Sequence, residues 1–193
     1  MSASNIVKSN SINTLVVNAF GGPNSGKSKM TSAIFSELKE WGVSCEIAAE
    51  FAKDLVWEER KKTFEDQIYI FGKQFHRIFR LLGKVNVVLT DSPLLFTPIY
   101  DAQRRSSLEK LAMEEYSRMW NYNIFFKRTQ PYNPVGRNHT EDEAKQVDCD
   151  ILNMLDINHY PYEVFDGNLS STNKIVEKIL TLLHYDRKLK TIR

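Results

Sequence analysis

The sequence predicts an α/β domain in which helices cover both faces of a five-stranded parallel sheet. Short apolar runs alternate along the chain with longer amphipathic runs, and parallel strands need such a helical connection between them. The chain has 193 residues, which is enough for one domain with a full core. We therefore expect a domain over residues 14–184, with a flexible leader at 1–13 and a basic tail at 185–193.

Each predicted element is recognised by its periodicity. The first strand, residues 14–20, is almost wholly apolar and ends at two glycines, which is typical of a buried strand. The other predicted strands occupy residues 44–49, 85–89, 123–126 and 162–165. Amphipathic runs predict helices over residues 27–41, 63–82, 106–120, 140–155 and 175–183. In such a sheet ligands bind at the carboxyl ends of the strands, so the residues that follow each strand are candidates for function.

Two of these helices carry a start signal. Ser106 with Glu109, and Thr140 with Glu143, have the spacing of a capping box, in which both side chains satisfy free amides at the helix start. The longest predicted helix has an apolar stripe along one face. The stripe consists of Phe64, Ile68, Phe71, Phe75, Ile78 and Leu82.

Composition excludes several classes of protein. The chain has 26 basic and 24 acidic residues, so no global field draws it onto nucleic acid or a membrane. Its two cysteines, Cys45 and Cys149, form neither a disulfide framework nor a metal motif, which favours a reducing compartment. Charges interrupt every long apolar run, and the first 13 residues do not form a signal peptide. We expect a cytoplasmic location without membrane contact.

The strongest functional signal is the segment GGPNSGKS, residues 21–28. It has the spacing of a phosphate-binding loop, in which a glycine and four further residues precede Gly-Lys-Ser at the start of a helix. Glycines let backbone amides approach a polyphosphate, and the helix N-terminus favours an anion. We expect Lys27 to reach the terminal phosphates of ATP and the Ser28 hydroxyl to bind Mg²⁺.

An acidic residue follows the third predicted strand. Asp91, in the segment VVLTDSP, stands where proteins with such a loop carry the acid that positions Mg²⁺. Alone it could simply begin a turn before Pro93. The phosphate loop upstream favours the metal role, shared with Ser28.

Further features favour a kinase among nucleotide-binding classes. Switch GTPases need Asn-Lys-x-Asp to read guanine, whereas Asn173-Lys174 is followed here by Ile175 and Val176. The chain also has little room for the helical lid domain of motor ATPases. A kinase needs a group that orients or deprotonates the acceptor hydroxyl. Glu50, at the end of the second predicted strand, is the candidate.

A kinase also needs a basic lid that excludes water. The predicted lid is the polar segment at about 128–140, RTQPYNPVGRNHT. We expect Arg137, which follows Gly136, to swing onto the transferring phosphoryl group and stabilise its growing charge. Arg128 and Lys127 are weaker candidates for the same role.

Several more polar residues have two interpretations. Gln67, Gln74 and Arg77, on the longest predicted helix, could read a base or a sugar, but an exposed polar helix face is the simpler explanation for each. Arg104 and Arg105 could line the acceptor side, and a basic helix start is equally consistent with the sequence.

These motifs form a series that resembles a known family. The series is GGPNSGKS, AAEFAKD, VVLTDSP, PYNPVGRNHTEDEA and YEVFDGN. It is similar to the small P-loop kinases of the nicotinamide-riboside kinase type and their phage-encoded nucleotide kinase relatives, over about residues 14–183. The resemblance implies the P-loop NTPase fold, Mg-ATP as donor and a nucleoside- or nucleotide-like acceptor. It maps working positions onto Lys27, Ser28, Glu50, Asp91 and Arg137.

The sequence therefore predicts a kinase that transfers the γ-phosphoryl group of ATP to a hydroxyl of a nucleoside- or nucleotide-like acceptor. The predicted catalytic residues are Lys27, Glu50, Asp91 and Arg137, and the predicted Mg²⁺ ligands are Ser28 and Asp91. The predicted ATP contacts are Gly22, Asn24, Ser25, Gly26, Lys27, Ser28, Met30 and Arg128. We expect a monomer or a homodimer.

Three different functions are also compatible with these motifs. Related phage enzymes include kinases that phosphorylate the hydroxymethyl group of a modified pyrimidine, such as hydroxymethyluracil, already in DNA. The basic run at 187–190 and the pair Arg104-Arg105 would suit DNA phosphates. A phosphate loop also occurs in ATPases that are driven by a partner, and in nucleotide-binding modules with little catalysis.

Overall fold

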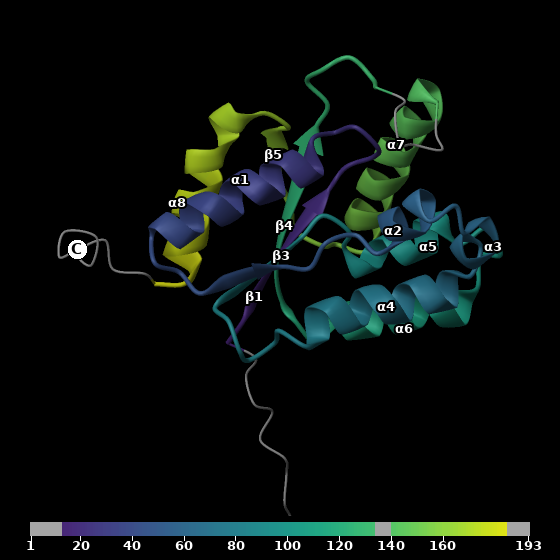
Figure 1. The fold of residues 1–193 in the computed structure, drawn as a ribbon, viewed down its shortest axis with the longest axis horizontal. Helices are drawn as coiled ribbons and strands as arrows, with labels where there is room; N and C mark the ends of the chain where they lie inside the picture. Colours follow the sequence, from purple (N-terminus) through teal and green to yellow (C-terminus); the bar gives the residue numbers. More distant parts are fainter. Residues whose placement is uncertain (1–12, 134–139, 185–193) are drawn as a thin grey trace, which may run out of the picture.

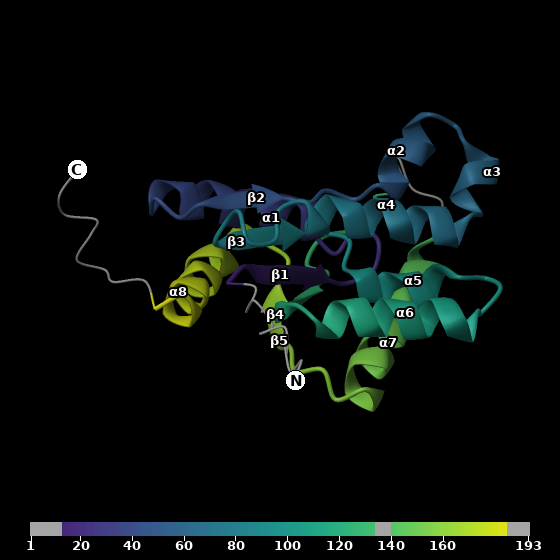
Figure 2. The same cartoon turned by 90° about the horizontal axis from the view of Figure 1, so that it is seen from below.

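The computed structural model describes residues 13–133 and 140–184 of the chain (Figure 1). Within these ranges five parallel strands form one sheet in the order β2-β3-β1-β4-β5, which Figure 2 shows from top to bottom. The strands are β1 (Leu15–Phe20), β2 (Cys45–Ile47), β3 (Val87–Thr90), β4 (Trp120–Lys127) and β5 (Glu163–Asp166). The predicted α/β fold class and its five-stranded parallel sheet are confirmed.

Strand β1 lies at the centre of the sheet. Its register pairs Leu15 with Val87 of β3 on one side and with Trp120 of β4 on the other. All six residues of β1 are buried, because helices cover both faces of the sheet. The segment that follows β1 therefore begins at the middle of the sheet's carboxyl edge.

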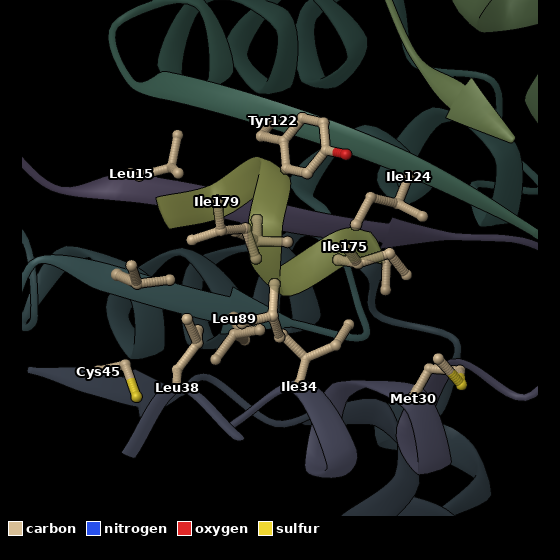
Figure 3. Packing of buried hydrophobic residues seen from close by; sticks show 14 of the residues in the cluster. Leu15, Met30, Ile34, Leu38, Cys45, Leu89, Tyr122, Ile124, Ile175 and Ile179 are labelled. Atoms are coloured by element: carbon tan, nitrogen blue, oxygen red, sulfur yellow. The ribbon is translucent and has the colours of Figure 1, made fainter. Parts of the chain in front are cut away.

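Helices cover both faces of the sheet, with one apolar cluster on one face and two on the other. On one face α1 (Lys27–Glu40) packs beside α8 (Thr172–Leu182). Figure 3 shows this cluster, in which Met30 and Ile34 of α1 lie opposite Ile175 of α8. On the other face lie α4 (Gln67–Phe79), α6 (Ser106–Ser117) and α7 (Glu141–Ile157). The predicted placement of helices on both faces is thus confirmed.

The helix predicted over residues 63–82 is broken. It forms two helices, α3 (Lys61–Phe64) and α4, because the Asp66 carboxylate accepts a hydrogen bond from a first-turn amide and caps α4. The predicted apolar stripe is wrong at Ile68, whose side chain is 56% exposed. The break turns α3 away from the line of α4, beyond its N-terminal end (Figure 2).

One of the two predicted capping boxes is present. Thr140 Oγ1 accepts a hydrogen bond from the Glu143 amide and the Glu143 carboxylate accepts one from the Thr140 amide, at 3.3 and 2.6 Å. The prediction at Ser106 is wrong, since Arg105 caps α6 and no side chain closes its first turn. The buried Asp101 carboxylate accepts the hydrogen bond of the Arg105 amide instead.

Two short helices were not predicted. They are α2 (Ala52–Trp57) and α5 (Thr97–Tyr100), and each is too short for helical periodicity to show in the sequence. Both lie near the carboxyl edge of the sheet, beside α4 (Figure 1). Within residues 13–133 and 140–184, no helix combines the length and apolar character that crossing a bilayer requires.

Candidate active site

The loop between β1 and α1 has the backbone that a phosphate loop requires. Gly26 caps α1 in the left-handed region, with a φ of 94°. A Cβ at this position would lie 2.6 Å from the carbonyl oxygen of Gly167, so no larger residue fits. Asn24 also has a positive φ, of 65°. The loop therefore directs its backbone towards the space above the N-terminus of α1.

Lys27 lies across this loop. Its Nζ donates hydrogen bonds to the carbonyl oxygens of Gly21 and Gly22, at 2.6 and 2.9 Å. Burial lowers the pKa of this ammonium, while the nearby carboxylates of Glu50 and Asp91 act in the opposite direction. The half-buried ammonium is thus held by two neutral carbonyl acceptors.

Ser28 and Asp91 form the pair that the sequence predicted for the metal. The Ser28 hydroxyl donates to Asp91 Oδ2 at 2.6 Å, and Asp91 Oδ1 accepts the Glu50 amide at 3.1 Å. A hydroxyl beside a carboxylate is an all-oxygen donor set, which fits a hard cation such as Mg²⁺ that completes its shell with phosphate and water. The two residues come together because α1 and β3 meet at the sheet edge.

Glu50 lies just beyond the end of β2, half-buried at the same edge. Burial raises the pKa of its carboxyl group, and the neighbouring Lys27 ammonium opposes part of that rise. The order β2-β3-β1 brings Glu50 next to the phosphate loop, as the sequence predicted. A carboxyl group with a raised pKa beside a cation is suited to accept a proton from a hydroxyl.

A cavity of about 420 Å³ joins these groups. The phosphate loop and Glu50 form one end. The remainder is mostly apolar and aromatic, with several side chains from α2 to α5. They include Val56, Trp57, Phe64, Ile70, Phe71, Phe96 and Tyr100. Such a wall can enclose a flat apolar group next to the carboxyl group of Glu50.

Asp148, on α7, is a member of the site that sequence reasoning missed. Its Oδ1 accepts the Gly22 amide at 2.5 Å and its Oδ2 pairs with Arg128 at 2.9 Å. Arg128 also donates to the Pro23 carbonyl oxygen at 2.9 Å. Arg128 therefore supports the phosphate loop from outside the cavity. No motif marks Asp148, because its role depends on the packing of α7 against the loop.

Met30, a predicted ATP contact, needs correction. Its side chain is fully buried in the cluster between α1, α8 and the sheet, and it does not line the cavity (Figure 3). Its amide donates to the Gly26 carbonyl oxygen at 2.9 Å as part of the helix. The position after the loop points into the core because α1 packs against the sheet.

The other predicted site residues differ in whether they line the cavity. Asn24, Ser25 and Gly26 line the cavity with Lys27 and Ser28. Arg105 makes two side-chain hydrogen bonds to Asp101, at 2.8 and 3.1 Å, and is not free to face an acceptor. Arg137 lies outside the described residues.

Comparison with solved structures identifies the fold. A deoxyadenosine kinase from M. mycoides, with the products dCMP and a flexible dCDP bound, matches 89% of this chain and 100% of its own with a TM-score of 0.51. The same kinase with bound dCTP matches 86% and 99%, also at 0.51. The sequence identities are 16% and 15%. No family model and no curated protein matches the chain.

The likeness assigns the fold and leaves the family open. The chain has the fold of the deoxyadenosine kinase structures. Membership of the narrower nicotinamide-riboside kinase-like or phage group stays a prediction.

Proposed function

We propose that this protein is a kinase that transfers the γ-phosphoryl group of ATP to a hydroxyl of a nucleoside- or nucleotide-like acceptor. One observation carries the proposal. The Glu50 carboxyl group, the Lys27 ammonium and the Ser28–Asp91 pair meet at one end of a cavity whose remaining walls are mostly apolar and aromatic. A nucleotide-binding module would need the loop, but not a carboxyl group that faces the apolar part of the same cavity.

Each group has a role in the proposed reaction. Lys27 and the loop amides from residue 24 onward bind the β- and γ-phosphates, since the Gly22 amide is bound by Asp148. Ser28 and Asp91 would hold Mg²⁺, which neutralises charge on the phosphates. Glu50 orients the acceptor hydroxyl and accepts its proton as the oxygen attacks the γ-phosphorus and the bond to ADP breaks. Burial of Glu50 and Lys27 strengthens these interactions, since less water screens them.

The lining of the cavity favours a small acceptor. Its aromatic walls suit a base, and the amide side chain of Gln67 gives one polar group in the same wall. Action on a modified base in DNA needs cations beside the cavity. Arg105, one candidate for that task, is bound to Asp101, whereas Lys29 and Lys53 line the cavity. The bacterial deoxyadenosine kinase structures contain deoxynucleotides, which is consistent with an acceptor of this class.

Transfer of labelled γ-phosphate from Mg-ATP tests the proposal. The acceptors are nucleosides, nucleoside monophosphates and nicotinamide riboside, beside duplex DNA with and without hydroxymethyluracil. We expect label on a small molecule. Label on modified DNA alone would replace this acceptor class with a DNA kinase, and hydrolysis that no acceptor stimulates would favour a partner-driven ATPase.

A further inference from the structure

Helix α4 holds the backbone that carries Glu50. Between β2 and α2, residues 48–51 form no regular secondary structure, yet four of their backbone groups have side-chain partners. Two of those partners, Gln74 and Arg77, lie on α4 one turn apart. Such irregular segments are ordinarily mobile, so this density of contacts needs an explanation.

Gln74 binds this segment on both sides of Glu50. Its Oε1 accepts the Phe51 amide at 2.9 Å, and its Nε2 donates to the Ala48 carbonyl oxygen at 3.4 Å and to Thr90 Oγ1 at 3.3 Å. The orientation of the amide is fixed, because Phe51 offers a donor and Ala48 an acceptor. The side chain is 4% exposed. Its donors are thus committed to the protein, although the residue borders the cavity.

Arg77 adds a second attachment from the same helix. Its Nη1 donates to the Ala49 carbonyl oxygen at 3.0 Å, and its guanidinium group lies 5.2 Å from the centre of the Phe51 ring. It also pairs with Asp54 at the start of α2. The two residues on either side of Glu50 are therefore both held by Arg77.

We propose that Gln74 and Arg77 are positioning residues that hold the Glu50 carboxyl group at the acceptor hydroxyl. The Glu50 amide, the last of the four backbone groups, donates its hydrogen bond to Asp91. This bond fixes the position of Glu50 relative to the Ser28–Asp91 pair. A carboxyl group displaced by about 1 Å loses much of its catalytic effect, on the order of 100-fold. This function differs from the recognition of a base or sugar that their sequence positions suggested.

The inference rests on the proposed function for the role of Glu50, and kinetics test it. The variants are Gln74→Leu, which keeps a similar side-chain size but loses the amide, and Arg77→Gln. Arg80→Gln is the control, since Arg80 is exposed at the C-terminal end of the same helix. For an acceptor found in the panel above, we expect kcat to fall about 10- to 100-fold in both variants. The KM for ATP should stay within about twofold, and the control should match the parent protein.

A different division of the effect between kcat and KM would overturn the inference. If Gln74 reads the acceptor, Gln74→Leu raises the KM for acceptor, changes the preference among bases and leaves kcat unchanged. If the residue serves only folding, the folded variant keeps the parent kcat. Arg77→Gln changes a half-buried surface position, so it decides the question even where Gln74→Leu fails to fold.

Amide hydrogen exchange separates this inference from the kinase assignment. In the parent protein the Phe51 amide should exchange slowly, and Gln74→Leu should speed its exchange by about tenfold or more. The exchange measurement does not depend on enzymatic activity. Absence of transfer to every acceptor would remove the proposed function while the exchange still reports whether α4 holds the segment. Unchanged exchange in Gln74→Leu would reject the positioning role even in an active kinase.

Discussion

The proposed donor end and the proposed acceptor end of the cavity are built in different ways. At the donor end, one continuous segment of residues 23–28 supplies the backbone and Lys27. At the acceptor end, the wall comes from α2 to α5, and Glu50 is held there by side chains of a helix more than twenty residues away. In the proposed reaction phosphate is bound by main-chain amides, whose geometry is local, whereas the proposed acceptor end depends on side chains brought together by packing.

This difference predicts how the two ends respond to change. At the donor end, substitutions of single loop residues should be enough to lower activity. At the acceptor end, substitutions of residues that touch no substrate should also lower activity, because these residues hold Glu50 in position. Substitutions at both ends, taken from the largest expected effect to the smallest, can break or sharpen this contrast.

Lys27→Ala should have the largest effect. Loss of the ammonium removes the charge that stabilises the transferring phosphoryl group, so we expect kcat to fall on the order of 1,000-fold. The circular dichroism spectrum should be unchanged. Lys39→Ala is the matched control, because Lys39 lies at the opposite end of α1 and its side chain is exposed. Near-normal transfer by Lys27→Ala would contradict the kinase assignment.

Glu50→Gln should separate activity from stability. We expect kcat to fall on the order of 100-fold or more, because the amide accepts no proton. Since burial raises the pKa of Glu50 above its usual 4.5, the folded protein binds this proton more tightly than the unfolded chain does. Its stabilising contribution is therefore present below about pH 4.5 and is lost as the pH rises through the folded pKa.

Glu50→Gln, which is neutral at every pH, should consequently have a higher Tm than the parent protein at pH 7. The difference in Tm between the two proteins should shrink towards pH 4. Thermal unfolding of both proteins at the two pH values measures this. Glu46→Gln, at an exposed site on β2, is the control for both measurements. A lower Tm for Glu50→Gln at pH 7 would show that the charged carboxylate is stabilised by its partners.

Gly167→Ala tests how tightly the sheet edge supports the donor loop. An added Cβ would overlap the Ser25 carbonyl oxygen, so the loop must shift. We expect a loss of about 1–3 kcal/mol in the free energy of unfolding and a higher KM for ATP. Gly72→Ala is the matched control, since nothing lies within 4 Å of a Cβ there. Because Gly72 lies within α4, that variant should gain about 0.5–1 kcal/mol in urea unfolding.

The smallest effect should come from the cap of α7, the helix that supplies Asp148. Thr140→Ala removes one of the two hydrogen bonds of the capping box and should lower the free energy of unfolding by about 1 kcal/mol. Ser106→Ala is the comparison, because the Ser106 side chain caps no helix, and its change should stay within about 0.5 kcal/mol. Equal losses in urea unfolding would mean that the Thr140 box contributes nothing of its own.

The predictions from sequence succeeded where interactions are local. The five strands and the Thr140 box follow from neighbouring residues. The Ser106 box failed although its spacing is the same, because Ser106 lies inside the helix and the Asp101 carboxylate accepts the amide of the N-cap residue Arg105. The predicted long helix failed at Asp66, a strong cap inside an otherwise apolar periodicity.

The sequence by itself determined the α/β class, the donor loop and the identity of Lys27, Ser28, Glu50 and Asp91 as candidates, since these depend on periodicity and on motifs at strand ends. Only the tertiary structure decided what surrounds them. It assigned Met30 to the core, brought Asp148 to the loop and directed Gln74 and Arg77 towards the backbone around Glu50. Such contacts join segments far apart in the chain, and they depend on how helices pack across the sheet, which no local pattern records.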